Sequence, residues 1–242
     1  MTYTLYYSPD SANLVIRMVL EELTLDYQGR EVPRKRTDRD ESFLRLNPRG
    51  LLPVLIDDDI NTALFETAAI LLYLADKHGA LAPKPSGHTA RGEMLKWLFM
   101  LSNTLHADLA IRFYPERYVT SDAEISPLLS ATKRRVLGHI KLIEQALNAH
   151  DGTWLLADGP SICDFYLGCC VRWAQLYPET GPALLPEEVG ALPKLTAMLG
   201  RLQQHASVQR ALDRENIAGN AFIQPCSPLP PRKRDAIGTT PP

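Results

Sequence analysis

The spacing of hydrophobic positions changes near residue 80 of the chain. Before this point, short apolar runs that predict strands alternate with segments whose apolar residues recur at helical spacing. The expected elements are a strand over 3–7, a helix over 13–23, a strand over 27–32, a short helix over 41–46, strands over 53–57 and 63–65, and a helix over 67–78. This order, β-α-β-α-β-β-α, predicts a small α/β domain over residues 1–80.

Strand signals nearly vanish beyond residue 80. Residues 79–88 hold two prolines and two glycines, which is typical of a linker. Helical spacing then recurs over 91–114, 127–150, 161–177, 192–206 and 208–214. We therefore expect an all-helical domain over residues 89–215. Residues 216–242 carry six prolines and little periodicity, which predicts an extended, weakly ordered tail.

Composition and charge narrow the class of protein. The net charge of −2 gives no basic footprint for nucleic acid, and the basic run Arg232-Lys233-Arg234 lies in the predicted tail. No apolar run approaches the length of about 18 residues that a membrane span needs. The four cysteines form no Cys-x-x-Cys pair and have no spacing suited to zinc. We expect a cytoplasmic protein that binds no nucleic acid, membrane or metal.

The first strand-to-helix junction reads Tyr7-Ser-Pro-Asp-Ser-Ala-Asn13. Ser11 lies at the start of the predicted helix, where free N–H groups and a partial positive charge gather. A hydroxyl at this position can donate a hydrogen bond to an anion. The alternative is that Ser11 or Asn13 simply caps the helix.

A second segment, Asn47-Pro-Arg-Gly-Leu-Leu-Pro-Val-Leu55, places Pro53 at the opening of a strand. Proline cannot donate to a strand ladder. A cis bond between Leu52 and Pro53 would turn the backbone of Leu52 outward, where an extended peptide could pair with it. The alternative is an ordinary trans proline at a strand edge.

The third segment is Phe65-Glu-Thr-Ala-Ala-Ile70, at the start of the helix over 67–78. Thr67 and the free amides of this helix end could hold a ligand carboxylate, and Glu66 could accept from a ligand ammonium group. The alternative is a plain helix cap. A fourth segment, Ser161-Ile-Cys-Asp164, reads as a capping box, and we assign it to folding.

Taken together, these segments resemble the cytosolic glutathione transferase family over residues 3 to about 216. The proline of Asn47–Pro53 matches the one that is cis in the family, and Glu66–Ile70 matches the family's Glu-Ser/Thr-x-Ala-Ile segment. Ser161–Asp164 matches the capping box of its helical domain. The resemblance implies a thioredoxin-like domain followed by an all-α domain, a homodimer, and glutathione as co-substrate.

The resemblance also implies how glutathione would be held. The implied glutathione-binding residues are Asn13, Arg49, Leu52, Pro53, Glu66 and Thr67. Leu52 would pair with the cysteinyl backbone, while Glu66 and Thr67 would hold the γ-glutamyl amine and carboxylate. Ser11 matches the serine that faces the thiol in serine-type classes. Tyr7 lies at the position of the tyrosine used by other classes, so Ser11 and Tyr7 are both candidate catalytic residues, with Ser11 favoured.

The opening segment is similar to the bacterial beta class, in which a cysteine occupies the position of Ala12. A mixed disulfide cannot form here, so cysteine-type redox chemistry is not expected at this position. Thr104-Leu-His106 resembles the helix of that class that carries an active-site histidine. His106 could contact the thiol or the second substrate, or it could be a structural histidine.

The second substrate is expected between the two domains. His106 is a candidate for binding an electrophile through this resemblance, and Arg112, Phe113 and Tyr114 are candidates because they end a long helix that should reach the interdomain cleft. The expected activity is addition of the glutathione thiolate to small electrophiles, or its use to reduce small peroxides, with no metal or second cofactor. The alternative is a non-catalytic glutathione-binding or protein-interaction module on the same fold.

Overall fold

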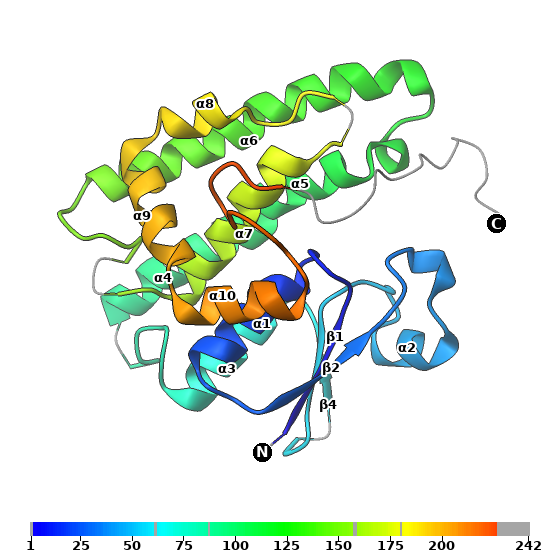
Figure 1. The fold of residues 1–242 in the computed structure, drawn as a ribbon, viewed down its shortest axis with the longest axis vertical. Coiled ribbons are helices and arrows are strands. Elements are labelled where there is room, and N and C mark those ends of the chain that lie inside the picture. The colour runs from blue at the N-terminus through cyan, green and yellow to red at the C-terminus, as the bar shows by residue number, and fades with distance from the viewer. Residues whose placement is uncertain (1, 61, 87, 157–158, 180, 227–242) are drawn as a thin grey trace.

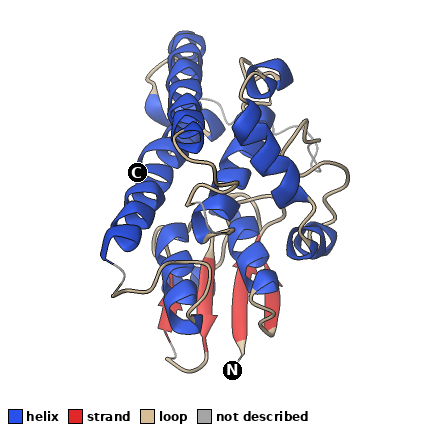
Figure 2. Cartoon of the chain, turned by 90° about the vertical axis from the view of Figure 1, so that its left-hand side faces the viewer, coloured by secondary structure: helices blue, strands red, loops and turns tan. Residues whose placement is uncertain are grey.

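A computed structural model describes residues 2–60, 62–86, 88–156, 159–179 and 181–226. The N-terminal part forms a sheet flanked by helices, and a larger group of helices lies against it (Figures 1 and 2). Helices α1 and α10 run side by side at the junction of the two parts. The candidate site residues predicted from the sequence come from both parts, so the packing at this junction determines which of them lie close together.

The sheet has the strand order β2-β1-β3-β4. The strands are β1 (Tyr3–Tyr7), β2 (Tyr27–Glu31), β3 (Val54–Asp57) and β4 (Thr62–Leu64). Strand β1 pairs parallel with β2 and antiparallel with β3, and β3 pairs antiparallel with β4. A parallel pair needs a crossover connection, and α1 supplies it between β1 and β2. The α/β thioredoxin-like domain expected from the sequence is confirmed.

Three helices accompany the sheet: α1 (Asn13–Glu22), α2 (Glu41–Leu46) and α3 (Thr67–His78). Helix α1 is buried along nearly its whole length because it packs against α3, α7 and α10 as well as β1. Its apolar run therefore forms the joint between the sheet and the helical domain. The bond between Leu52 and Pro53 is cis, as the resemblance implies.

The second part is helical throughout its described length. Its helices are α4 (His88–Met100), α5 (His106–Phe113), α6 (Ile125–Asn148), α7 (Ile162–Leu176), α8 (Pro186–Gly190), α9 (Pro193–Gln203) and α10 (Ala206–Arg214). A π-helical turn over Leu101–Leu105 joins α4 to α5, so the two form one run close to the expected helix over 91–114. Within the described residues, no helix is long and apolar enough to span a bilayer.

Helix α7 is the centre of the helical part, and its start is the predicted capping box. The Ser161 side chain accepts from the backbone N–H of Cys163, and Asp164 accepts from the backbone N–H of Ser161 at 2.8 Å. Asp164 also accepts from the backbone N–H of Leu155 at 2.9 Å. One buried carboxylate thereby ties the preceding loop to the helix start, as the sequence predicts.

The segment after α10 differs from the weakly ordered tail expected from sequence. Ala221 and Phe222 are completely buried. The side chain of Gln175 donates to the carbonyl of Phe222 at 2.8 Å, and Arg172 donates to that of Ala221 at 3.0 Å. Polar groups of α7 therefore satisfy a backbone with no regular structure of its own, a contact that periodicity cannot reveal. Residues 227–242 of the predicted tail lie outside the described residues.

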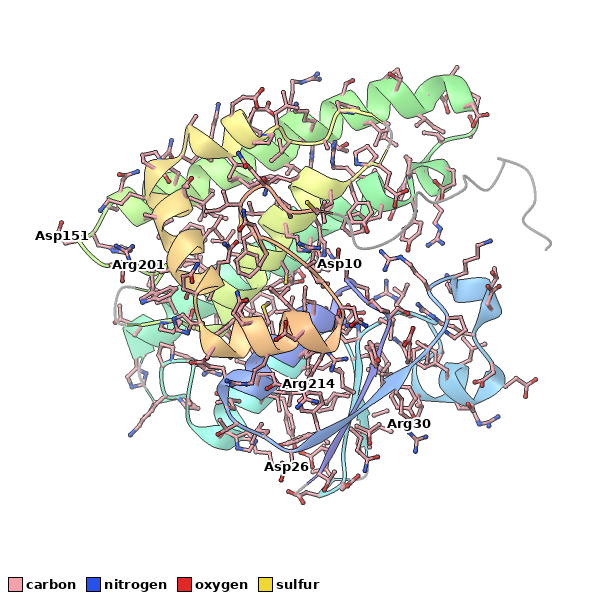
Figure 3. All side chains as sticks on the ribbon, in the orientation of Figure 1. Asp10, Asp26, Arg30, Asp151, Arg201 and Arg214 are labelled. Atoms are coloured by element: carbon pink, nitrogen blue, oxygen red, sulfur yellow. The ribbon has the colours of Figure 1, made fainter. Side chains whose placement is uncertain are left out.

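Two buried ion pairs hold the loop before α1 against the helical part. Arg172 on α7 donates to both carboxylate oxygens of Asp10 at 2.8 Å, and neither side chain is exposed. Figure 3 labels Asp10, which lies where the sheet domain meets the helices. Glu215, just after α10, accepts from the backbone N–H of Asp10 at 2.7 Å and from Arg17 at 2.8 Å. Asp10 has a φ of 53°, a left-handed conformation that costs free energy in a non-glycine residue. These contacts therefore sustain the shape of the loop.

We expect Arg172→Met to lower the free energy of unfolding by about 3–5 kcal/mol, because it leaves the Asp10 carboxylate buried without its partner. Urea denaturation followed by circular dichroism measures this change. Arg201→Met removes an equivalent charge from an exposed position on α9 and should cost no more than about 0.5 kcal/mol. Equal effects of the two substitutions would contradict a structural role for the pair.

Candidate functional site

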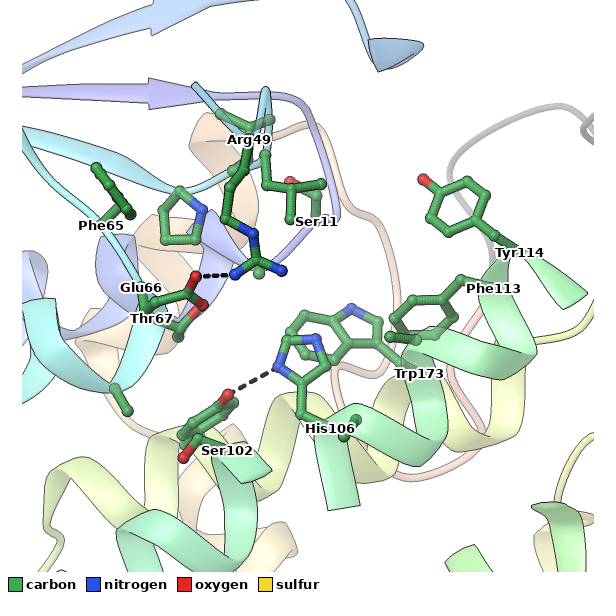
Figure 4. Close-up of a pocket in the computed structure, with 18 of the residues that line it drawn as sticks. Ser11, Arg49, Phe65, Glu66, Thr67, Ser102, His106, Phe113, Tyr114 and Trp173 are labelled. Carbon is green, nitrogen blue, oxygen red and sulfur yellow. Dashed lines mark hydrogen bonds and ion pairs between the residues drawn. The ribbon is translucent and has the colours of Figure 1, made fainter. Parts of the chain in front are cut away.

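A cavity of about 1010 Å³ opens where the two parts of the chain meet (Figure 4). Its walls are the β1–α1 loop, the segment after β2, the loop before β3, the start of α3, and faces of α4, α5 and α7. The predicted site residues that line it are Ser11, Arg49, Leu52, Pro53, Glu66, Thr67, His106, Phe113 and Tyr114. Tyr7, Asn13 and Arg112 are not among its lining residues.

Ser11 lies on the cavity wall, one residue before the N-cap of α1. The N-cap residue is Ala12, so neither Ser11 nor Asn13 caps the helix through its side chain. The hydroxyl of Ser11 donates to the side-chain oxygen of Asn13, which is fully buried. Asn13 in turn donates to Glu215 at 2.8 Å. The hydroxyl of Ser11 is thus accessible from the cavity, and the buried side-chain amide of Asn13 positions it.

Tyr7 points away from this wall. Its hydroxyl lies 3.5 Å from Glu31 on strand β2, and the guanidinium of Arg17 covers its ring at 4.4 Å from the centroid. Burial, with the charge of Glu31, raises the pKa of Tyr7, so its hydroxyl holds its proton more tightly than a free tyrosine. The geometry favours Ser11 over Tyr7 as the group that faces a ligand thiol.

The start of α3 presents unsatisfied donors to the cavity. Glu66 is the N-cap residue, and its side chain makes no capping hydrogen bond. Thr67, Ala68 and Ala69 follow it and all line the cavity. The first amides of a helix lack intrahelical partners and carry a partial positive charge. The sequence-based prediction of an anion site at this helix end is compatible with this arrangement.

Glu66 and Arg49 form an ion pair at the mouth of the cavity (Figure 4). Both side chains are more than half exposed, so the pair is loosely held and a ligand can replace it. The loop that carries Arg49 is shaped by Asn47, whose side chain accepts from the backbone N–H of Arg49 at 3.1 Å and donates to the carbonyl of Leu51 at 3.0 Å. Leu52 follows, lining the cavity before the pairing of β3 begins.

His106 reaches the cavity from the first turn of α5. Its Nδ1 lies 2.7 Å from the hydroxyl of Tyr166, and its ring lies 5.1 Å from that of Trp173. Burial lowers the pKa of His106 to about 4. The imidazole is therefore neutral near pH 7. Its Nδ1 is occupied by the hydrogen bond with Tyr166, and the ring lines the cavity.

Arg112, which we expected in the cleft, faces the opposite way. It is 1% exposed and donates to the carbonyls of Leu129, Tyr177 and Pro182, at 2.8, 3.3 and 2.6 Å. Its neighbours Phe113 and Tyr114 do line the cavity. One step along a helix turns a side chain by about 100°, so Arg112 is directed away from the cavity although Phe113 lines it. Arg112 therefore joins α5 to α6 and to the segment after α7.

Several lining residues were missed by the sequence analysis. Phe99, Ser102 and Asn103 come from the same helical run as His106, at spacings of three to seven residues from it. That helical spacing, taken from His106, could have identified them. Trp173 and Tyr166 lie in the apolar run of α7, whose sequence indicates only a buried core helix. Arg34, Arg36 and Arg39, in the segment after β2, carried no recognisable signal.

Comparisons with known proteins agree with this geometry. Residues 14–77 match the family model "Glutathione S-transferase, N-terminal domain". Over 218 residues, the chain is 27% identical to glutathione S-transferase GstA of Escherichia coli O157:H7, covering 88% of this chain and 98% of the relative.

Solved structures extend the likeness to the whole fold. A sphingomonad glutathione S-transferase complexed with glutathione has a TM-score of 0.72 and 28% identity, over 89% of this chain and 100% of that one. The bacterial beta-class glutathione S-transferase of Sphingomonas chungbukensis has a TM-score of 0.71 and 28% identity, over 89% of this chain and 100% of that one. Residues 14–77 therefore belong to the glutathione S-transferase N-terminal domain family, and over nearly its whole length the chain is similar to bacterial glutathione S-transferases, beta-class members among them.

Proposed function

We propose that this protein is a glutathione S-transferase that adds the thiolate of glutathione to small electrophiles. The observation that carries the proposal is the convergence on one cavity of the Ser11 hydroxyl, the Glu66 carboxylate and the open end of α3. A protein that kept the fold only as a scaffold would not need these groups to converge. A cytoplasmic homodimer, which the family resemblance implies, is part of the same proposal.

The glutathione tripeptide fits the chemistry of this wall. Thr67 and the free amides behind it would receive the γ-glutamyl carboxylate. Glu66 would accept a hydrogen bond from the γ-glutamyl ammonium group, which would replace Arg49 as its ion-pair partner. The backbone of Leu52, held before cis-Pro53, would pair with the cysteinyl residue as an added strand. This arrangement brings the cysteinyl sulfur toward the β1–α1 loop, where Ser11 lies.

The energy needed to activate the thiol is within the reach of Ser11. A free thiol titrates near pH 8.5, and lowering its pKa by two units takes roughly 2.7 kcal/mol of preferential thiolate stabilisation. One charge-assisted hydrogen bond contributes about 1.5–3 kcal/mol. The hydroxyl of Ser11 would turn its proton from Asn13 to the sulfur, and the N-terminus of α1 would add a favourable field.

The electrophile would lie against His106, Phe113 and Tyr114, the predicted second-substrate residues that line the cavity. Because burial keeps the imidazole of His106 neutral, it can offer a hydrogen bond without repelling a cationic group or neutralising the thiolate. Catalysis would then rest on positioning the thiolate beside the electrophilic carbon. Arg112 has no direct part in this proposal.

Glutathione binding is the first test of the proposal. Isothermal calorimetry should show binding at millimolar glutathione or below. Thr67→Val should weaken it at least tenfold, because the hydroxyl's hydrogen bond to a carboxylate contributes about 1.5–3 kcal/mol. Thr62→Val, on exposed strand β4, is the matched control. No heat of binding at millimolar ligand would exclude the proposal, while binding without turnover of any electrophile would favour the non-catalytic module.

The assignment of Ser11 can be tested through the thiol itself. In Ser11→Ala, we expect the pKa of enzyme-bound glutathione to rise by about one to two units, since one charge-assisted hydrogen bond is lost. Ultraviolet absorbance of the thiolate during a pH titration measures it. Tyr7→Phe should leave this pKa unchanged. A rise in Tyr7→Phe and none in Ser11→Ala would reverse the assignment.

The neutrality of His106 has a consequence for pH dependence. Its pKa is lowered on folding, so the unfolded chain takes up a proton first, and this residue lowers stability as the pH falls from about 6.5 toward about 4. Nitrogen-detected NMR of labelled histidine should show His106 neutral down to about pH 5. A His106 titration near pH 6.5 would contradict the buried environment.

A further inference from the structure

The cavity of this protein carries more positive than negative charge. Five arginines line it: Arg34, Arg36, Arg39, Arg49 and Arg117. The carboxylates that line it are Asp10 and Glu66. Asp10 is neutralised by Arg172 and Glu66 by Arg49. Within the described part of the chain, Arg34, Arg36, Arg39 and Arg117 form no ion pair, so four positive charges face this space without a carboxylate.

Arg34 bridges the two walls of the cavity. It donates to the carbonyl of Pro9 in the β1–α1 loop at 2.7 Å and to the hydroxyl of Tyr177 after α7 at 2.9 Å. Its Nε is buried and has no hydrogen-bond partner among the described residues. Arg34 is therefore held in place by neutral groups and retains an unused donor and a full charge.

Arg39 shows the same pattern. It donates to the carbonyls of Pro33 at 3.0 Å and Arg34 at 3.2 Å, and to that of Gly50. Backbone carbonyls satisfy its donors but bring no net charge to balance it. Burial lowers the pKa of Arg39, with a smaller contribution from the positive charges of Arg36 and Arg34. The segment after β2 therefore holds three mutually repelling cations at the cavity.

Arg117 completes the pattern from the helical part. Its guanidinium lies 4.0 Å from the centre of the Tyr114 ring, which itself lines the cavity beside Phe113. Arg117 and Arg36 are both exposed, so their side chains can turn toward a bound molecule. The cavity thus combines an aromatic wall, suited to a flat apolar group, with cations on both sides of its mouth. The glycyl carboxylate of glutathione can neutralise one of these four charges, so an acceptor that has only apolar surface would leave the others without an anionic partner.

We propose that the second substrate is an electrophile that bears a carboxylate or similar anionic group, held by Arg34, Arg36 and Arg117 while its reactive carbon lies against Phe113 and Tyr114. This inference rests on the proposed transferase function and names its substrate class. With an aryl halide, the thiolate attacks the carbon that carries chlorine, the C–S bond forms, and chloride leaves with the C–Cl bonding pair. The thiol proton passes to water.

Two acceptors that differ in charge at one position give the test. We would compare para-chlorodinitrobenzoate with its primary amide, each corrected for its uncatalysed rate with glutathione. Wild type should prefer the carboxylate about tenfold or more in kcat/KM, as expected for one charge-assisted hydrogen bond. The preference should decline as ionic strength rises, because salt screens exposed charges.

Substitutions then locate the anion site. Arg36→Gln and Arg117→Gln should each reduce the ratio of carboxylate to amide turnover severalfold, and the double variant should reduce it further. Both arginines are exposed, so the variants should fold, whereas Arg34 also ties the β1–α1 loop and is less suited. Arg45→Gln removes the same charge from exposed α2 outside the cavity lining and should retain the wild-type ratio.

The possible outcomes distinguish the proposed anionic acceptor from the proposed transferase function. Equal turnover of the two acceptors would overturn the inference and leave the transferase intact. A raised KM for glutathione in the arginine variants, at an unchanged acceptor ratio, would also overturn it, because the cations would then serve glutathione's own carboxylate. Absence of glutathione-dependent turnover with either acceptor, together with absence of glutathione binding, would instead contradict the proposed function.

Discussion

The buried ion pair between Asp10 and Arg172 is the contact on which the geometry of this site depends. Asp10 belongs to the loop that carries Ser11, and Arg172 belongs to the central helix of the other domain. Because both charges are fully buried, each is stable only in the presence of the other. The position of the loop is thereby set by the helical domain, and the two walls of the cavity are linked by one interaction.

Glu215 supports the same loop from the end of α10. It accepts from the backbone N–H of Asp10, from Asn13 and from Arg17. Asn13 accepts a hydrogen bond from the hydroxyl of Ser11, so a chain of hydrogen bonds runs from Glu215 in the helical domain to the candidate catalytic group. Burial raises the pKa of Glu215, against the effect of Arg17. The environment of Ser11 therefore depends on a residue some 200 positions away in the chain.

The cavity has a net positive potential because its carboxylates are paired and most of its arginines are not. Its carboxylates have arginine partners, whereas Arg34, Arg39 and Arg117 contact carbonyls, a tyrosine hydroxyl or an aromatic face. The open N-terminus of α3 adds further positive potential. Clefts that carry one sign of charge attract ligands of the other sign. Glutathione and an anionic acceptor would both be drawn to the same mouth.

The sequence by itself determined most of the elements and the segments proposed to hold glutathione, because those signals are local. Strand β1, helix α2 and helix α3 begin and end where the hydrophobic pattern and the caps indicate, and Pro53 and Glu66–Thr67 lie at the starts of elements, which local sequence identifies. Only the tertiary structure decided which side chains of the helical domain look inward. Arg112 and Phe113 are adjacent in sequence and diverge in space, while Arg34 and Tyr177 are distant in sequence and touch. The physical reason is that helix orientation and long-range ion pairs depend on packing between domains, which no local pattern encodes.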